Sequence, residues 1–221
     1  MVILAVGWRL AYHTHMSIRR SEPPQRVGLA ITGASGAIYG LRVLEELLRV
    51  QGLEVHLTIS AAAAKVLRAE HDIAVTLDRF DPRVLKVRGA QRAIYHHHEN
   101  VAAPLASGSF RLRALAIVPC SMGCAGKIAH GISGDLIERA ADVMIKERRT
   151  LVVVPRETPL SAIHLDNLTR LAHLGVTVLP AAPGFYGRPK RVDDLVDFIV
   201  ARVLDHLGVE HRLGPRWGEK T

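Results

Sequence analysis

The sequence predicts an α/β fold: a Rossmann-like, doubly wound sheet that is mostly parallel and forms a single domain. Short apolar strands alternate with helical patterns along the chain, which is typical of a parallel sheet covered by helices on both faces. A Gly-rich turn joins the first strand to the first helix, as in nucleotide-binding α/β domains. The 221 residues are 48% hydrophobic, and a chain of this size can bury one substantial core.

Five apolar runs have the length of strands and end at turn residues or at the start of a helical pattern. Most of them are rich in Val, Ile and Leu, as expected for strands that are buried on both faces. They lie at residues 27–31, 54–60, 112–119, 151–155 and 176–180.

Helical patterns follow the first strands. The segment 41–50 comes after the Gly-rich turn, and the Ala-rich segment 61–70 follows the second strand. Residues 133–149 are amphipathic, because apolar side chains recur at helical spacing from Ile132 onward. Ser121, directly after a strand, could cap a helix of its own.

The last two helices have clear end signals. Thr158 is a good N-cap with Pro159 at the first helical position, and Gly175 closes that helix. The final helix covers residues 192–207 and ends at Gly208. Between them, the last predicted strand leads into a loop rich in Pro and Gly.

Two motifs that could suggest a metal are better explained otherwise. Residues 71–113 are predicted to be irregular, and three adjacent histidines there, 96–98, cannot all point at one ion from a regular element. We interpret them as a solvent-facing loop. Cys120 and Cys124 are too few for a structural zinc site, and their spacing is not that of a redox pair. We expect reduced thiols, a cytoplasmic protein and no bound metal.

Composition excludes other classes of partner. The net charge is +8, and a basic protein can bind nucleic acid. The basic residues are scattered, however, and do not interleave with aromatic side chains, which disfavours nucleic-acid binding. No apolar window is long enough for a spanning helix, so no membrane is expected. A small phosphorylated ligand accounts for part of the positive charge equally well.

Residues 1–25 differ from the rest and are predicted to be a flexible N-terminal extension. A signal peptide is poorly supported, because Arg9 breaks the apolar run and no basic region precedes it. The first acid is Glu22, so an amphipathic organelle presequence stays open as an alternative. Met16 is a possible second initiator.

The Gly-rich turn Gly33–Ala37 predicts a phosphate site. A strand, a tight turn and a helix in this order place backbone N–H groups and the positive end of a helix dipole at one spot. The Ser35 hydroxyl can add a donor. A purely structural turn is the competing interpretation.

A short-chain dehydrogenase is the nearest competitor for this turn. Its pattern requires glycine where this chain has Ala37 and Tyr39, and a dinucleotide site prefers an acid where the second strand ends in Ser60. Tyr186 and Lys190 match its catalytic spacing, but Pro189 makes that segment a loop. We therefore disfavour NAD.

Polar side chains follow several predicted strands at the point where each strand ends. These side chains are Ser35, Ser60, Ser121, Arg156 and Glu157. Because the carboxyl ends of parallel strands meet at one edge, where ligands bind, we expect these residues to lie together. Ser60, Ser121 and Glu157 could each instead be only a helix cap.

Two cations suggest a second anion site. Lys146 lies at a helix end, where complementing the helix dipole is the default explanation. Arg202 lies at the edge of an apolar helix face, so it needs an anion, either a ligand phosphate or a neighbour such as Asp205. Glu70 and Glu157 add two carboxylates, but no pair of nucleophile and base is evident. This set suits chemistry that a cofactor performs while the protein positions charges.

With these residues assembled, the chain resembles the flavin prenyltransferases of the UbiX family, formerly described as aromatic acid decarboxylases. The resemblance covers residues 26–219, and implies that 26–221 form a flavoprotein-type FMN-binding domain. It rests on eight ordered motifs, which are Thr32–Ala37, Ala106–Ser109, Pro119–Ser121, Glu138–Val143, Lys146–Arg149, Arg156–Pro159, Pro183–Tyr186 and Pro215–Trp217.

The resemblance implies a metal-independent enzyme that joins a dimethylallyl group from dimethylallyl phosphate to N5 and C6 of reduced FMN. The product, prenylated FMN, would serve a partner decarboxylase in pathways such as ubiquinone biosynthesis. The family assembles as homo-oligomers with sites at subunit interfaces, so a dodecamer is expected. The implied FMN ligands are Gly33, Ala34, Ser35, Ser60, Ser121, Met122, Gly123, Cys124 and Arg156.

The same resemblance implies the substrate and catalytic residues. Lys146, Glu157, Tyr186 and Arg202 would hold dimethylallyl phosphate. The implied catalytic set is Ser35 near flavin N5, Glu70 and Glu157 for phosphate protonation, Lys146 for the leaving phosphate, and Trp217 beside the developing cation.

Two departures from the family pattern concern the flavin side. Cys124 stands where relatives often have Thr, and Val101 stands where some have an aromatic residue. Two other functions stay open: a flavin-dependent cysteine decarboxylase, which shares the fold, and an FMN carrier without chemistry. The second phosphate site disfavours the carrier. The cysteine decarboxylase is disfavoured because the segment typical of that group is absent around Ser121.

Overall fold

The computed structural model describes residues 25–214. The predicted extension therefore lies outside the described residues except for Gln25, which begins the first strand. Trp217 also lies outside them.

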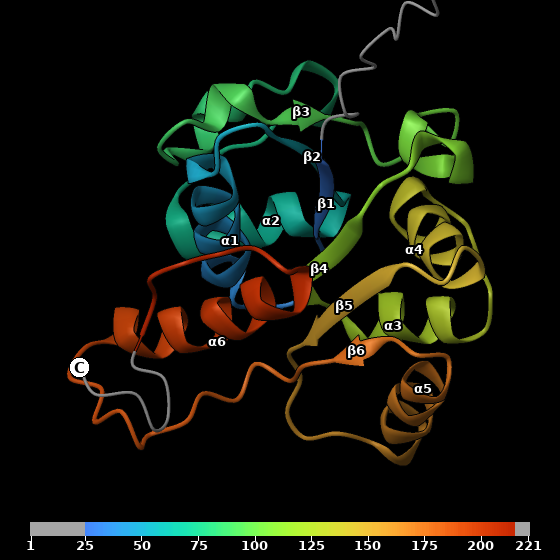
Figure 1. Cartoon of the computed structure of the whole chain (residues 1–221). Coiled ribbons are helices and arrows are strands. Elements are labelled where there is room, and N and C mark those ends of the chain that lie inside the picture. Colours follow the sequence, from blue (N-terminus) through green and yellow to red (C-terminus); the bar gives the residue numbers. More distant parts are fainter. Residues whose placement is uncertain (1–24, 215–221) are drawn as a thin grey trace, which may run out of the picture.

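In the described part of the chain, six strands form one sheet, and every pairing between neighbours is parallel (Figure 1). The order β3-β2-β1-β4-β5-β6 is that of a doubly wound nucleotide-binding sheet. The predicted fold class is confirmed. The strands are β1 (Gln25–Ile31), β2 (Leu53–Ile59), β3 (Ile94–Tyr95), β4 (Ala114–Cys120), β5 (Thr150–Pro155) and β6 (Thr177–Val178).

Side chains of the central strands alternate between two cores, one on each face of the sheet. In β4, Ala114, Ala116 and Val118 pack into the core on one face, whereas Leu115 and Ile117 pack into the core on the other. This alternation follows from the two-residue period of a strand. A strand buried on both sides explains why the sequence shows continuous apolar runs.

Within residues 25–214, six α-helices cover the sheet in two layers (Figure 1). Helices α1, α2 and α6 contribute to the first core, and α3, α4 and α5 to the second. Their bounds are α1 (Ala37–Arg49), α2 (Ala61–His71), α3 (Met122–Ala129), α4 (Leu136–Lys146), α5 (Ala162–His173) and α6 (Val192–Leu207).

Three predicted helix starts are wrong. Helix α1 begins at Ala37, four residues before the predicted segment 41–50. Helix α5 begins at Ala162, not at Pro159, because Ser161 accepts the His164 N–H and the His164 ring bonds back to the Ser161 N–H. Helix α4 begins at Leu136, where Asp135 caps it. Ile132 therefore precedes that helix and is 52% exposed.

The segment between α2 and β4 is less irregular than predicted. It contains β3 and five short 3₁₀ turns, which are Leu77–Arg79, Pro82–Leu85, Ala90–Arg92, Pro104–Ala106 and Gly108–Phe110. A solvent-facing position is wrong for His96, because its ring is half-buried and stacks on His56 with 5.2 Å between centroids. His56 and His96 also share a hydrogen bond of 2.9 Å between ring nitrogens.

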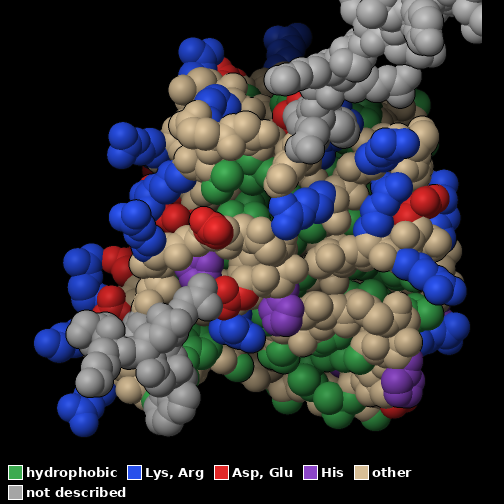
Figure 2. Space-filling view, in the orientation of Figure 1, with side chains coloured by type: hydrophobic (Ala, Val, Ile, Leu, Met, Phe, Trp, Pro, Cys, Tyr) green, Lys and Arg blue, Asp and Glu red, His purple; other side chains and the backbone are tan. Residues whose placement is uncertain are grey.

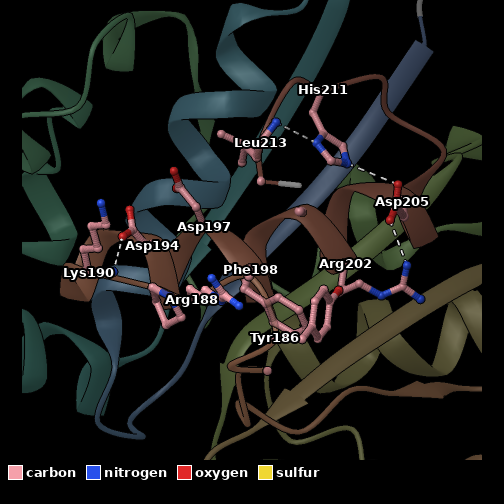
Figure 3. A pocket seen from close by; sticks show the side chains of 15 residues that line it. Tyr186, Arg188, Lys190, Asp194, Asp197, Phe198, Arg202, Asp205, His211 and Leu213 are labelled. Carbon is pink, nitrogen blue, oxygen red and sulfur yellow. Dashed lines mark hydrogen bonds and ion pairs between the residues drawn. The ribbon is translucent and has the colours of Figure 1, made fainter. Parts of the chain in front are cut away.

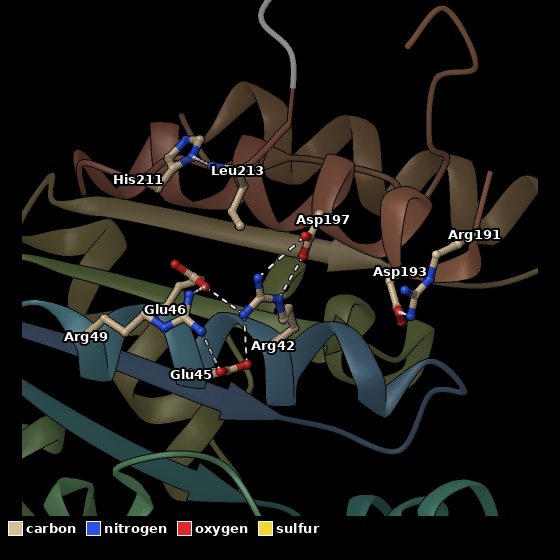
Figure 4. Close-up of polar contacts among 9 residues, drawn as sticks. All are labelled: Arg42, Glu45, Glu46, Arg49, Arg191, Asp193, Asp197, His211 and Leu213. Carbon is tan, nitrogen blue, oxygen red and sulfur yellow. Dashed lines mark hydrogen bonds and ion pairs between the residues drawn. The ribbon is translucent and has the colours of Figure 1, made fainter. Parts of the chain in front are cut away.

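An ion cluster fixes α6 against α1 (Figure 4). Arg42 of α1 lies 2.8 Å from Asp197 of α6, and it also contacts Glu45 at 2.8 Å and Glu46 at 2.6 Å. These side chains are only about one-fifth to one-third exposed, or less for Glu46, so the contacts are weakly screened. The cluster sets the position of the helix that carries Arg202.

The surface agrees with the scattered charge of the sequence. In the face shown in Figure 2, Lys and Arg side chains are spread among acidic and apolar ones. Between residues 25 and 214, no helix has the length and apolarity needed to cross a membrane.

Candidate functional site

The carboxyl ends of the central strands meet at one edge of the sheet. The Gly-rich turn follows β1, Ser60 follows β2, Ser121 follows β4, and Arg156 follows β5. β1 and β4 are neighbours, and the helices that follow them pack on opposite faces. This is the switch point of a doubly wound sheet, where ligands bind.

Thr32 ties the two central loops together, and sequence reasoning gave it no role. Its buried hydroxyl donates to the Pro119 carbonyl at 2.8 Å and accepts the Ser121 N–H at 2.8 Å. The Thr32 N–H reaches the same carbonyl at 3.2 Å. A polar residue directly after an apolar strand was the only signal in the sequence.

The Gly-rich turn is shaped by two glycines in different ways. Gly36 has φ 98°, a left-handed conformation that favours glycine, and it precedes α1. A side chain at Gly33 would collide with Ala62 of α2. Gly33 thus allows the turn to pack closely on that helix. Arg156 then donates from Nε to the Ser35 carbonyl at 2.8 Å, which connects the ends of β1 and β5.

Glu70 takes the place that the sequence assigned to a phosphate. Its carboxylate accepts the Gly36 N–H at 3.0 and 3.1 Å and the Ala37 N–H at 2.9 Å. The prediction that this turn offers free N–H groups is wrong for these two residues. Burial alone would raise the pKa of Glu70, but hydrogen bonds from the Ser35 hydroxyl and these two N–H groups lower it.

Ser60 and Ser121 cap the helices that follow them. The Ser60 Oγ accepts the Ala63 N–H at 3.1 Å, and the Ser121 Oγ accepts the Cys124 N–H at 3.3 Å. A hydroxyl that accepts in this way still has its own proton to donate. The capping interpretation is therefore confirmed, and it is compatible with a ligand at the same edge.

The first turn of α3 combines buried and open positions. Met122 is buried at 6% exposure, whereas a Cβ atom added at Gly123 would meet no atom within 4 Å. A hydrogen bond with the Cys120 thiol, together with burial, raises the pKa of the Cys124 thiol. Cys124 is thus a neutral thiol, and both cysteines are free as expected.

A second feature is a cavity of about 670 Å³ between α6 and the loop that precedes it (Figure 3). Tyr186 and Arg202 both line it. The Tyr186 ring meets Phe198 edge to face, with centroids 5.7 Å apart. Arg202 pairs with Asp205 at 2.9 Å. Of the two anions expected beside Arg202, the structure thus contains the neighbouring carboxylate.

Lys146 lies apart from both features. It ends α4, four residues before β5 begins, and it contacts Glu147 at 2.5 Å. Arg156 follows the other end of β5, and a six-residue strand is about 20 Å long. Lys146 therefore belongs to the opposite edge of the sheet from Arg156. Glu157 is exposed, and its carboxylate accepts the Thr158 N–H at 3.0 Å.

The predicted site residues thus form three groups in one chain. Ser35, Glu70 and Arg156 are joined by hydrogen bonds around the Gly-rich turn. Tyr186 and Arg202 share the cavity. Lys146 is not brought to either of them.

We call the residues that follow β1, β2, β4 and β5 at the carboxyl edge of the sheet (Ser35, Ser60, Ser121 and Arg156) the cradle. The fold and the cradle define a nucleotide-binding protein of the Rossmann-like class. The sequence profile of the flavoprotein family matches residues 15–204. Flavin prenyltransferase UbiX of Halalkalibacterium halodurans is 50% identical over 192 residues, which are 87% of this chain and 93% of the relative. The Pseudomonas aeruginosa enzyme of the same name is 48% identical, over 89% of this chain and 96% of its own. The chain belongs to the UbiX flavin prenyltransferase family.

Solved structures agree with this assignment. A dodecameric FMN-dependent UbiX-like decarboxylase from Escherichia coli O157:H7 superposes with a TM-score of 0.80 at 39% identity, covering 88% of this chain and all of that one. AnUbiX, crystallised with FMN and dimethylallyl pyrophosphate, gives a TM-score of 0.79 at 38% identity, covering 90% of this chain and all of that one.

Proposed function

We propose that this protein transfers a dimethylallyl group from dimethylallyl phosphate to N5 and C6 of reduced FMN, and that a partner decarboxylase uses the prenylated FMN. The observation that carries the proposal is the gathering of Ser35, Ser60, Ser121 and Arg156 at one edge of the sheet. That edge is the nucleotide site of doubly wound folds.

The residues at this edge fit FMN. Ser60 and Ser121 lie at the N-termini of α2 and α3, where the helix dipole favours a phosphate. Gly123 leaves open space beside Ser121, so a flat ring can approach the backbone there. We assign FMN binding to these residues, to Gly33–Ser35, Met122 and Cys124, and to Arg156. Reduced FMN supplies the electron-rich nitrogen and carbon that the prenyl unit alkylates.

The cavity on α6 suits the prenyl phosphate. Arg202 offers a guanidinium to phosphate oxygens, and the ring of Tyr186 offers both an apolar face and a hydroxyl. AnUbiX was solved with a dimethylallyl diphosphate, which supports a substrate of this class. We propose the monophosphate for this protein.

Copies of this chain must combine to complete the site. Lys146 cannot reach the opposite edge of its own sheet, because about 20 Å of β5 separates it from Arg156. An oligomer can bring Lys146 of one subunit to the cradle of another. The dodecameric E. coli relative supports this arrangement, and we propose a dodecamer here as well.

The protein's own part in the reaction is to place charges. Breaking the allylic C–O bond leaves positive charge on the prenyl unit and negative charge on the phosphate, so Arg202 and Lys146 stabilise the leaving group. These cations make a metal unnecessary. Glu70 accepts the Ser35 hydroxyl and so orients it, and we assign Ser35 to the reactive edge of the flavin. Glu157 is assigned to phosphate protonation, and Trp217 to the developing cation.

The remaining expectations belong to the same proposal. We place the protein in the cytoplasm, since its two cysteines are free. We expect it to act without nucleic acid or membrane. Residues 1–24 are proposed to be an extension outside the FMN-binding domain, since Gln25 already belongs to β1.

Release of inorganic phosphate tests this function. The protein is mixed anaerobically with reduced FMN and dimethylallyl phosphate, and phosphate and remaining FMN are measured together. We expect one phosphate for each FMN consumed, and none with oxidised FMN. Release without loss of FMN would indicate a phosphatase instead. No release, with FMN still bound, would indicate a carrier. An Arg202→Gln variant should slow both changes equally.

A further inference from the structure

The segment after α6 folds back along that helix beside the cavity (Figure 3). Val209 and Leu213 pack against the core on this face of the sheet. Between them, the side chain of His211 is only 2% exposed and lies against Asp205 of α6. A buried imidazole has to satisfy both of its ring nitrogens, so its contacts indicate which nitrogen donates and which accepts.

The hydrogen bonds of His211 assign its tautomer. The Leu213 N–H donates to His211 Nδ1 at 3.1 Å. A backbone N–H can only donate, so Nδ1 holds a lone pair and the ring proton lies on Nε2. His211 Nε2 lies 3.2 Å from Asp205 Oδ1, and it therefore donates to that carboxylate.

The other oxygen of Asp205 holds Arg202. Arg202 Nη1 lies 2.9 Å from Asp205 Oδ2. The Arg202 side chain is 51% exposed and lines the cavity, as do Asp205 and the nearly buried His211. One line of hydrogen bonds thus runs to Arg202 in the cavity wall. It begins at the backbone N–H of Leu213 and passes through the side chains of His211 and Asp205 (Figure 3).

We propose that His211 is a positioning residue for Arg202. The proposal rests on the function above, in which Arg202 binds the substrate phosphate. Arginine side chains lose rotamer entropy when they are fixed. A guanidinium held before the ligand arrives avoids part of that cost at binding. His211 achieves this through Asp205, because its own side chain, although it borders the cavity, is only 2% exposed.

The hydrogen bond that His211 donates to Asp205 favours phosphate binding in a second way. Asp205 would otherwise direct its full negative charge at Arg202 and oppose an incoming phosphate. A hydrogen bond from His211 draws part of that charge to the other oxygen. Arg202 is thereby held in place and still attracts an anion.

Two substitutions at His211 separate this role from simple packing. His211→Phe keeps a ring but removes both hydrogen bonds, whereas His211→Gln keeps an amide that can donate to Asp205. We expect His211→Phe to raise KM for dimethylallyl phosphate about tenfold, the effect of one hydrogen bond, with kcat and the KM for FMN little changed. His211→Gln should stay within about threefold of the natural protein.

A binding measurement covers the cases that kinetics cannot. Calorimetry with inorganic phosphate gives a Kd without turnover. The phosphate affinity should be lower in His211→Phe than in the natural protein, and unchanged in His211→Gln. If His211→Phe fails to fold, His211→Leu takes its place, because it is smaller and likewise lacks both ring nitrogens, and it should lower the phosphate affinity in the same way. Equal KM and phosphate Kd in His211→Phe and the natural protein would overturn the proposal, as would equal losses in FMN and phosphate binding. Absence of prenylated flavin from the natural protein would instead refute the proposed function, and the phosphate Kd would still test His211.

Discussion

Thr32 provides a direct test of how the cradle is held together. Replacing it with valine keeps its shape and removes the hydroxyl that bridges Pro119 and Ser121. The two partners are affected differently. The Pro119 carbonyl keeps the Thr32 N–H at 3.2 Å, whereas the Ser121 N–H loses the bond that Thr32 accepts.

The size of the effect follows from these partners. A buried donor left without a partner costs about 1–3 kcal/mol, and a carbonyl that keeps one of two donors costs less. Burying an extra methyl group in place of the hydroxyl offsets part of this. We therefore expect Thr32→Val to lower the free energy of unfolding by about 2 kcal/mol.

Urea unfolding at a fixed protein concentration measures this change, since an oligomer's stability depends on concentration. Thr32→Ser is the matched control, because it keeps the hydroxyl and loses one methyl group at a cost of about 1 kcal/mol. The slope of the transition should be unchanged. If Thr32→Val proves as stable as the natural protein, the bridge between the β1 and β4 loops does not stabilise the fold and the reasoning is refuted.

Three further predictions concern the same edge of the sheet. Arg156→Gln should weaken FMN binding about 10- to 100-fold by loss of a charged hydrogen-bonding group, as followed by flavin fluorescence, and Arg156→Lys should recover part of it; equal affinity in all three would remove Arg156 from the site. Gly123→Ala should weaken FMN binding while leaving the urea midpoint nearly unchanged, because a Cβ there meets no protein atom within 4 Å; undiminished FMN binding would place the flavin elsewhere. The pKa of Glu70 is lowered by folding, so its contribution to stability is present above its ordinary pKa of 4.5 and is lost as the pH falls through the lower folded value. Glu70→Gln should therefore destabilise the protein at pH 7 and lose less stability on acidification, and parallel pH profiles of unfolding would contradict this.

Local sequence signals predicted the parts of the fold that depend on neighbours along the chain. Helix α6 begins and ends where its apolar period and Gly208 placed it. The start of α5 was missed because Thr158 and Ser161 are both plausible caps, and only the reciprocal bond with His164 selects Ser161. The two-residue strand β3 is too short to show a period.

The site depended on contacts that no local pattern contains. Glu70 reaches the Gly-rich turn across 34 residues, and Thr32 reaches Ser121 across 89. The strand-end rule correctly gathered Ser35, Ser60, Ser121 and Arg156, because it follows from parallel topology alone. It could not show that a side chain already occupies the N–H groups at the start of α1.

The mass of the flavin tests the central claim most directly. The protein is incubated without oxygen with reduced FMN and dimethylallyl phosphate, and the flavin is then extracted and weighed by mass spectrometry. We predict a flavin heavier by one prenyl unit, formed only when both substrates and the protein are present. Recovery of unmodified FMN from a preparation that binds both substrates would contradict the account.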